Sequence, residues 1–308
     1  MGGSCGVRGV GVETAVVGRW GVLYVLRRRM EAAGKLNAGG ASRMTKADAG
    51  IGAELSLEQR YAAVKGRVEA AAKRADRDPS RVHLIAVTKY AEMDDIKRLV
   101  ELGHRDFGEN RVQQLTQRAA MIEEMLRRRQ TLAGTVGDGA AASIEMPRWH
   151  MIGTLQRNKA KQVVECTRLI HSVDSMRLAE ELQSVGLKRE QRIDVLIQVN
   201  VSGEESKFGC PVPAAEPLAA AMESMAYLRV RGLMTMAPYS DNAEDARPHF
   251  ARLRDVYEDM AKLGFGDGAF NLLSMGMSGD YEVGIEEGAN LVRVGSAIFG
   301  ERKTDDEG

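Results

Sequence analysis

Apolar residues along the regular part of the chain follow two alternating patterns. Residues 55–75, LSLEQRYAAVKGRVEAAAKRA, place apolar positions three to four apart, which predicts an amphipathic helix. Beyond this helix, short continuous apolar runs alternate with amphipathic stretches. The eight runs lie at residues 82–87, 105–109, 149–153, 169–173, 194–201, 229–236, 271–278 and 291–300. Helix-like stretches follow nearly all of them, among them 92–103, 110–129 and 245–264.

Continuous apolar strands that alternate with helices are typical of parallel strands covered on both faces. Eight strand–helix units in about 250 residues predict an α/β fold, a single (β/α)8 TIM-type barrel. We expect this barrel to span residues 54–303, with an extra helix at its amino end. The alternative is an open doubly wound sheet, which would need a glycine-rich phosphate turn after an early strand. The stretch FGEN at 107–110 does not have the GxGxxG spacing.

Two segments do not follow the pattern. Residues 1–43 are rich in Gly and Arg and poor in acids, which fits a transit peptide, a disordered extension or a start assigned too early, with Met44 as the true start. We favour the last two interpretations, because serines are scarce in this segment and a transit peptide should be richer in them. Residues 130–147 show no periodicity, so we expect a mobile, irregular insertion in a strand–helix connection.

Charge and cysteine usage exclude several classes of partner. Lys+Arg and Asp+Glu both total 43, so the net charge of the 308 residues is zero and a nucleic-acid partner is not expected. A run of about 18 uncharged apolar residues is absent, so no membrane partner is expected either. Three scattered cysteines, Cys5, Cys166 and Cys210, favour a reducing compartment. We therefore expect a cytoplasmic protein; targeting to an organelle by residues 1–43 is the alternative.

In a barrel of this type, chemistry gathers at the carboxyl ends of the strands. The sequence places Lys89 at the end of the first run, Asn110 after the second and Arg293 inside the last. The glycine-rich stretches GMSGD and VGSAIFG follow or end the last two runs. Neither a His and carboxylate cluster with metal spacing nor a GxSxG nucleophile motif is present, so no metal is expected.

Each of these residues also has a purely structural interpretation. A lysine such as Lys89 is usually a solvated charge, and a buried arginine such as Arg293 needs a partner, which an internal carboxylate could supply. We interpret His150 as a hydrogen-bonded strand histidine. Lys159 and Lys207 fit solvated or phosphate-proximal lysines better than second imine sites. The combination of residues, in this order along the chain, favours a binding site.

The residues at the strand ends suit a ligand that carries an aldehyde and a phosphate. A lysine amine condenses with an aldehyde to an imine. Glycine N–H groups, a hydroxyl and a helix start bind phosphate, and barrels commonly provide these after strands seven and eight. Pyridoxal phosphate carries both groups on one ring.

Six motifs resemble the pyridoxal 5'-phosphate homeostasis proteins, the YggS/PROSC family. They are LIAVTKY, FGENRVQQ, WHMIGTLQRNK, GLMTMAP, LSMGMSGDYEVGIEEG and VRVGSAIFG, and they extend over residues 55–300. The resemblance implies a barrel like the N-terminal domain of alanine racemase, with pyridoxal 5'-phosphate bound to Lys89 as an imine and Arg293 facing the pyridine nitrogen. It places the phosphate near Ser278, Gly295 and Ser296, and Asn110 and Ser274 close to the ring or phosphate. The family typically has Thr where Ser296 stands.

From this resemblance we expect a cofactor-binding protein without turnover of its own that stores, buffers or delivers pyridoxal phosphate, with apo-enzymes as its partners. Without a second domain to form a dimer, we expect a monomer. Arginine keeps the ring nitrogen unprotonated, which weakens the ring as an electron sink. The sequence ends eight residues after VGSAIFG, so we expect no extra domain to supply a second base. The alternatives are a slow amino-acid racemase or lyase that uses the same imine and, more distantly, a barrel that binds another sugar or nucleotide phosphate.

Overall fold

A computed structural model describes residue 1 and residues 55–135, 145–204 and 207–300. The described residues from 55 onward belong to one compact unit. Its strands are β1 His83–Val87, β2 Asp106–Glu109, β3 Arg148–Met151, β4 Thr167–Val173, β5 Ile193–Asn200, β6 Cys210–Pro211, β7 Leu228–Met234, β8 Leu272–Ser274 and β9 Leu291–Val294. Its α-helices are α3 Leu57–Arg74, α4 Met93–Glu101, α5 Val112–Thr135, α6 Ala160–Val164, α7 Met176–Arg189, α8 Val212–Glu223, α9 Arg247–Ala261, α10 Tyr281–Glu286 and α11 Ser296–Phe299. Short 3₁₀ turns lie at η1 Pro79–Arg81, η2 Arg157–Lys159, η3 Ala243–Ala246 and η4 Gly266–Gly268.

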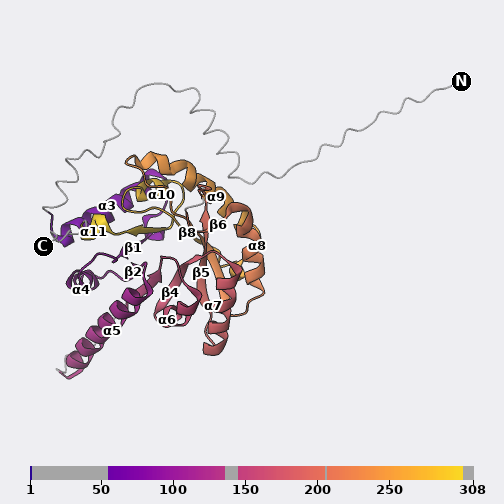
Figure 1. Cartoon of the computed structure of the whole chain (residues 1–308). Coiled ribbons are helices and arrows are strands. Elements are labelled where there is room, and N and C mark those ends of the chain that lie inside the picture. The colour runs from indigo at the N-terminus through magenta and orange to yellow at the C-terminus, as the bar shows by residue number, and fades with distance from the viewer. Residues whose placement is uncertain (2–54, 136–144, 205–206, 301–308) are drawn as a thin grey trace, which may run out of the picture. The chain divides into compact units, whose positions relative to one another are not determined.

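Eight of these strands close into a parallel barrel. The order β4-β3-β2-β1-β9-β8-β7-β5 is completed by a further pairing of β4 with β5. The pairs are parallel, and the register between β1 and β9 sets Ile85 opposite Arg293. The strands form the inner ring in Figure 1 and the helices lie around it. The predicted (β/α)8 barrel is therefore confirmed.

Burial on both faces of the strands explains their continuous apolar runs. β5 is buried at seven consecutive positions. A small apolar cluster fills the barrel interior, consisting of Ile85, Leu169, Leu196, Met234 and Leu291. A much larger cluster lies between the strands and the helices. Alternate strand residues belong to the two clusters, so the polar side chains that point into the barrel interior must be satisfied within it.

All eight predicted strands are present, but three details of the prediction were wrong. The two-residue strand β6, paired with β5 outside the ring, was missed. The run 271–278 stops being a strand after Ser274, and the run 291–300 becomes the short helix α11 after Gly295, because the backbone at Gly295 leaves the extended region. Helix α3 confirms the expected amino-terminal helix.

The expected insertion at 130–147 begins as helix. Helix α5 continues to Thr135, through positions that are exposed where their side chains are described. Extending an existing helix is far easier than starting one, so α5 continues without an apolar face to mark it. Residues 136–144, like residues 2–43 of the predicted extension, lie outside the described residues. No helix among the described residues combines the length and apolar character needed to cross a bilayer.

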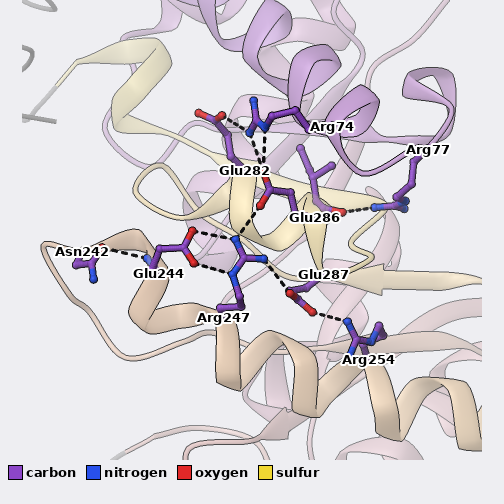
Figure 2. Close-up of polar contacts among 10 residues, drawn as sticks. Arg74, Arg77, Asn242, Glu244, Arg247, Arg254, Glu282, Glu286 and Glu287 are labelled. Carbon is purple, nitrogen blue, oxygen red and sulfur yellow. Dashed lines mark hydrogen bonds and ion pairs between the residues drawn. The ribbon is translucent and has the colours of Figure 1, made fainter. Parts of the chain in front are cut away.

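A network of ion pairs holds helix α10, which follows the loop after β8. Figure 2 shows Arg247 at the start of α9 between three carboxylates, Glu244, Glu286 and Glu287. On the other side of α10, Arg74 of α3 binds Glu282 and Glu286 at 2.8 and 2.9 Å. The α10 glutamates are each about a quarter exposed. As a connected network, these pairs fix α10 better than isolated surface pairs would.

Candidate functional site

Lys89 lies two residues beyond the end of β1, at the carboxyl end of the barrel. Thr88, between the strand and the lysine, is fully buried, and its N–H donates to the Gly108 carbonyl of the neighbouring strand at 3.0 Å. Lys89 itself is exposed, and its Nζ lies 4.8 Å from the centroid of the Tyr90 ring. The chain therefore leaves the core at Thr88 and presents Lys89 at the mouth of the barrel.

The turn that carries Lys89 is clamped from helix α5. Arg118 donates to the carbonyls of Thr88 and of Ala91, the latter at 2.8 Å, and so spans the lysine on both sides. Arg118 also pairs with Glu109, a fully buried carboxylate at the end of β2. Glu109 Oε1 accepts a further hydrogen bond from Thr88 Oγ1 at 2.5 Å. These contacts restrict the backbone around Lys89.

Arg293 points from β9 into the barrel interior and is only 3% exposed. Its Nη1 donates to Ser274 Oγ at 2.6 Å and its Nη2 to the carbonyl of Thr235 at 2.8 Å. Burial lowers the pKa of Arg293 to about 10, while the charge of Asp280 acts in the opposite direction. The guanidinium therefore stays charged at neutral pH, and its side-chain hydrogen bonds go to a hydroxyl and a carbonyl.

The loops after β8 and β9 meet in a cluster of N–H groups and a hydroxyl. Ser278 Oγ accepts hydrogen bonds from the backbone N–H of Gly295 at 3.1 Å and of Ala297 at 3.5 Å. A Cβ at Gly295 would come within 3.1 Å of the Val87 carbonyl, so the loop packs tightly against the end of β1. Gly276 has a φ of +97°, which favours glycine. The same donors can bind a phosphate oxygen.

Two further predicted site residues lie at the same end of the barrel. Ser296 is exposed at the start of α11, and Asn110 is exposed directly after β2. The loop after β3 packs on Asn110, because a Cβ at Gly153 would lie 2.2 Å from the Asn110 carbonyl oxygen. Of the seven predicted residues, two pairs are in hydrogen-bond contact. These are Ser274 with Arg293 and Ser278 with Gly295.

The remaining three, Lys89, Asn110 and Ser296, make no side-chain hydrogen bond to another member of the set in the described part of the chain. Lys159 is exposed in η2, and Lys207 is half-buried after β5. Neither lies in the two hydrogen-bonded pairs. They stay candidates for solvated or phosphate-proximal lysines.

His150 is a hydrogen-bonded strand histidine, as predicted. Its Nδ1 lies 3.0 Å from His171 Nε2 and its Nε2 lies 3.2 Å from Asp106 Oδ1. Within the described ranges, no three His, Cys, Asp or Glu side chains are grouped so that they could hold a metal ion.

Sequence reasoning missed four residues that support the site, although three of them carried a signal. Arg118 lies on the apolar face of α5, three residues after the buried Leu115 and four before the buried Ile122. A charged residue on such a face indicates a buried pair. His171 and Glu109 are polar residues inside or at the end of apolar runs. Thr235 acts through its carbonyl, which a sequence cannot indicate.

Comparison with known proteins agrees with this geometry. The family model described as alanine racemase, N-terminal domain, matches residues 60–303. A pyridoxal phosphate homeostasis protein from Aquifex aeolicus is 36% identical over 80% of this chain and 98% of its own length. One from Pseudomonas aeruginosa is 37% identical over 80% of this chain and 96% of its own length.

Solved structures show the same barrel. A crystal structure described as an unknown protein from Bifidobacterium adolescentis has a TM-score of 0.69 and 36% identity, covering 79% of this chain and 94% of that one. PipY of Synechococcus elongatus, solved with pyridoxal phosphate bound, has a TM-score of 0.61 and 29% identity, covering 76% of this chain and 100% of PipY. An alanine racemase from Clostridium difficile, at 11% identity and a TM-score of 0.55, shares the fold over 58% of its length.

The coverage of the curated relatives is nearly complete, and the matching family model extends over most of the described barrel. The resemblance inferred from the six sequence motifs is thereby confirmed. The chain belongs to the pyridoxal phosphate homeostasis protein family, whose barrel is of the alanine racemase N-terminal-domain type.

Proposed function

We propose that this protein binds pyridoxal 5'-phosphate and holds it as a Schiff base on Lys89. The observation that carries the proposal is the pairing of two neighbouring strands, one followed by the Lys89 turn that Arg118 clamps and the other presenting the buried Arg293. The Lys89 amine would add to the cofactor's aldehyde carbon, and water would leave as the carbon–nitrogen double bond forms. PipY, solved with pyridoxal phosphate bound, supports this choice of ligand.

The other site residues fit the remaining groups of the cofactor. Arg293 is charged and can only donate, so it suits an unprotonated pyridine nitrogen. Ser278 and the N–H of Gly295 already form a donor cluster of the kind that binds phosphate, and Ser296 would add a second hydroxyl. Asn110 and Ser274 would line the pocket. A Cβ at Gly295 would make a tight contact of 3.1 Å with the Val87 carbonyl oxygen, which fits a loop shaped to bind a ligand with its backbone.

We further propose that the protein stores, buffers or delivers the cofactor and has little turnover of its own. A pyridine nitrogen that accepts from Arg293 stays unprotonated, so a carbanion next to the ring is weakly stabilised. Delivery would require contact with apo-enzymes, and a monomer would leave the barrel mouth accessible to them. A cytoplasmic location fits the two described cysteines, Cys166 and Cys210, which are both free.

Two measurements on the purified protein test the role. Loaded protein, mixed with an apo-enzyme that depends on pyridoxal phosphate, should restore that enzyme's activity, and Lys89→Ala should carry no cofactor to transfer. Racemisation of alanine or serine should be absent or orders of magnitude below a typical turnover of about 10 per second. A turnover near that value that is lost in Lys89→Ala would show that the protein is a racemase.

A further inference from the structure

Five polar side chains form a continuous hydrogen-bonded chain through the barrel interior. It starts at Arg293, whose Nη1 donates to Ser274 Oγ at 2.6 Å. Ser274 Oγ lies 3.0 Å from His171 Nδ1, and His171 Nε2 lies 3.0 Å from His150 Nδ1. His150 Nε2 lies 3.2 Å from Asp106 Oδ1. The chain thus runs from the proposed cofactor site to Asp106, the first residue of β2.

The link between Ser274 and His171 spans the barrel. Ser274 ends β8, which pairs with β7 and β9, whereas His171 lies in β4, which pairs with β3 and β5. Their contact therefore crosses the interior. Ser274 and His171 are fully buried, and His150 is 4% exposed. A polar chain this deeply buried must be satisfied throughout, because each unpaired group would be strongly destabilising.

The donors and acceptors of the chain have one consistent direction. Arg148 binds both oxygens of Asp106 at 2.7 Å, and although burial opposes ionisation, the hydrogen bonds from Arg148 and His150 hold the pKa of Asp106 below its usual value. Asp106 is therefore an acceptor, and His150 Nε2 carries the proton. In the tautomer that carries its proton at Nε2, His150 accepts at Nδ1 from His171 Nε2–H.

The same direction of hydrogen-bond donation continues to the contact between His171 and Ser274. Burial lowers the pKa of His171 well below its usual value, and the charge of Arg293 adds to this effect, so the ring is neutral. With its Nε2 protonated, His171 can only accept at Nδ1, and it takes the hydroxyl proton of Ser274. The lone pairs of Ser274 Oγ are then left for the guanidinium of Arg293.

We propose that His171, His150 and Asp106 are positioning residues that act through Ser274 to keep Arg293 aimed at the cofactor's ring nitrogen. This inference rests on the proposed function of the site. If His171 cannot accept, the Ser274 hydroxyl proton is released to turn toward Arg293, and the arginine loses an anchor. The effect should be specific to the ring nitrogen, since no side-chain hydrogen bond among the described residues joins these five residues to Lys89 or Ser278.

The test compares the affinity for pyridoxal phosphate with that for an analogue in which a CH group replaces the ring nitrogen. Wild-type protein should prefer pyridoxal phosphate by about ten- to hundredfold, the range expected for a hydrogen bond to a charged group. His171→Leu should reduce this preference at least threefold, and His171→Gln, which can still accept and donate, should restore part of it. Equal weakening of both ligands in His171→Leu would overturn the inference and leave the proposed function intact.

A matched control separates positioning from general damage. Like the partly buried Asp106, the buried Asp194 lies near the amino end of a strand and binds arginine, with Arg229 at 2.7 Å and Arg231 at 2.8 Å, but it is not part of the hydrogen-bonded chain. If His171→Leu does not fold, Asp106→Ala carries the same test, with Asp194→Ala as its control. Only Asp106→Ala should lose the preference. A wild-type protein that binds neither compound would overturn the proposed function together with the inference.

Discussion

Replacing Arg118 by Met would remove the clamp on the lysine turn while keeping most of the side-chain volume. The substitution leaves the carboxylate of Glu109, which is fully buried, without its cationic partner. It also removes donors from the carbonyls of Thr88 and Ala91. Breaking a buried ion pair on one side costs about 3–5 kcal/mol. Because the Arg118 side chain retains 15% exposure, we expect the lower end, about 3 kcal/mol.

Chemical denaturation measures this change, with the midpoint falling and the slope unchanged. Arg127→Met on the same helix is the control, because its pair with Glu123 is exposed and should contribute only about 0.3–0.5 kcal/mol. Adding Glu109→Gln to Arg118→Met removes the unpaired charge and should recover part of the lost stability. The single variant should also form its Schiff base at least threefold more slowly. A stability loss below about 1 kcal/mol for Arg118→Met would refute the buried clamp.

Three further outcomes can be measured. Gly276→Ala should destabilise the protein by at least about 1–2 kcal/mol, because φ is +97° and the new Cβ would lie 2.8 Å from Tyr281 Cα. Gly279→Ala, with open space around it, should change the melting temperature little, and equal effects of the two variants would contradict this account. Burial lowers the pKa of His104 to about 4 from 6.5, so the unfolded chain binds the extra proton, and the free energy of unfolding should fall by roughly 3 kcal/mol as pH drops through that window. His104→Gln should remove this contribution and leave that of the buried His171. Replacing Ser278 and Ser296 together by Ala should reduce the preference for pyridoxal phosphate over pyridoxal by roughly ten- to thousandfold. If the double variant keeps the full preference, the phosphate is bound elsewhere, and Lys207 is the next residue to examine.

The barrel could be predicted from the sequence because its strands are buried on both faces. In runs such as 194–201, consecutive residues are apolar and buried in place of a strict alternation with exposed polar residues, and this leaves few architectures open. The ends of the strands and helices were harder to predict from the sequence. In 291–300 a strand and a helical turn are both apolar, and only the backbone at Gly295 separates them. β6 has two residues, too few to form any pattern.

In the site, too, some residues could be predicted from the sequence and others could not. Lys89, Arg293 and the glycine loops stand out in sequence because each is unusual where it occurs, at the end of a strand or inside one. The clamp by Arg118 and the chain through His171 depend on contacts between residues far apart in sequence, such as His171 with Ser274. Periodicity indicates that such polar residues are buried. It does not indicate which partner each one finds.

Reductive trapping tests the central claim most directly. Pyridoxal phosphate is added to the protein, the linkage is reduced with borohydride, and the labelled peptide is identified by mass spectrometry. The label should lie on Lys89, the visible absorption band should be absent in Lys89→Ala, and Lys159→Ala and Lys207→Ala should both label normally. Label found mainly on Lys159 or Lys207, or persisting in Lys89→Ala, would contradict the assignment of Lys89 as the residue that holds the cofactor.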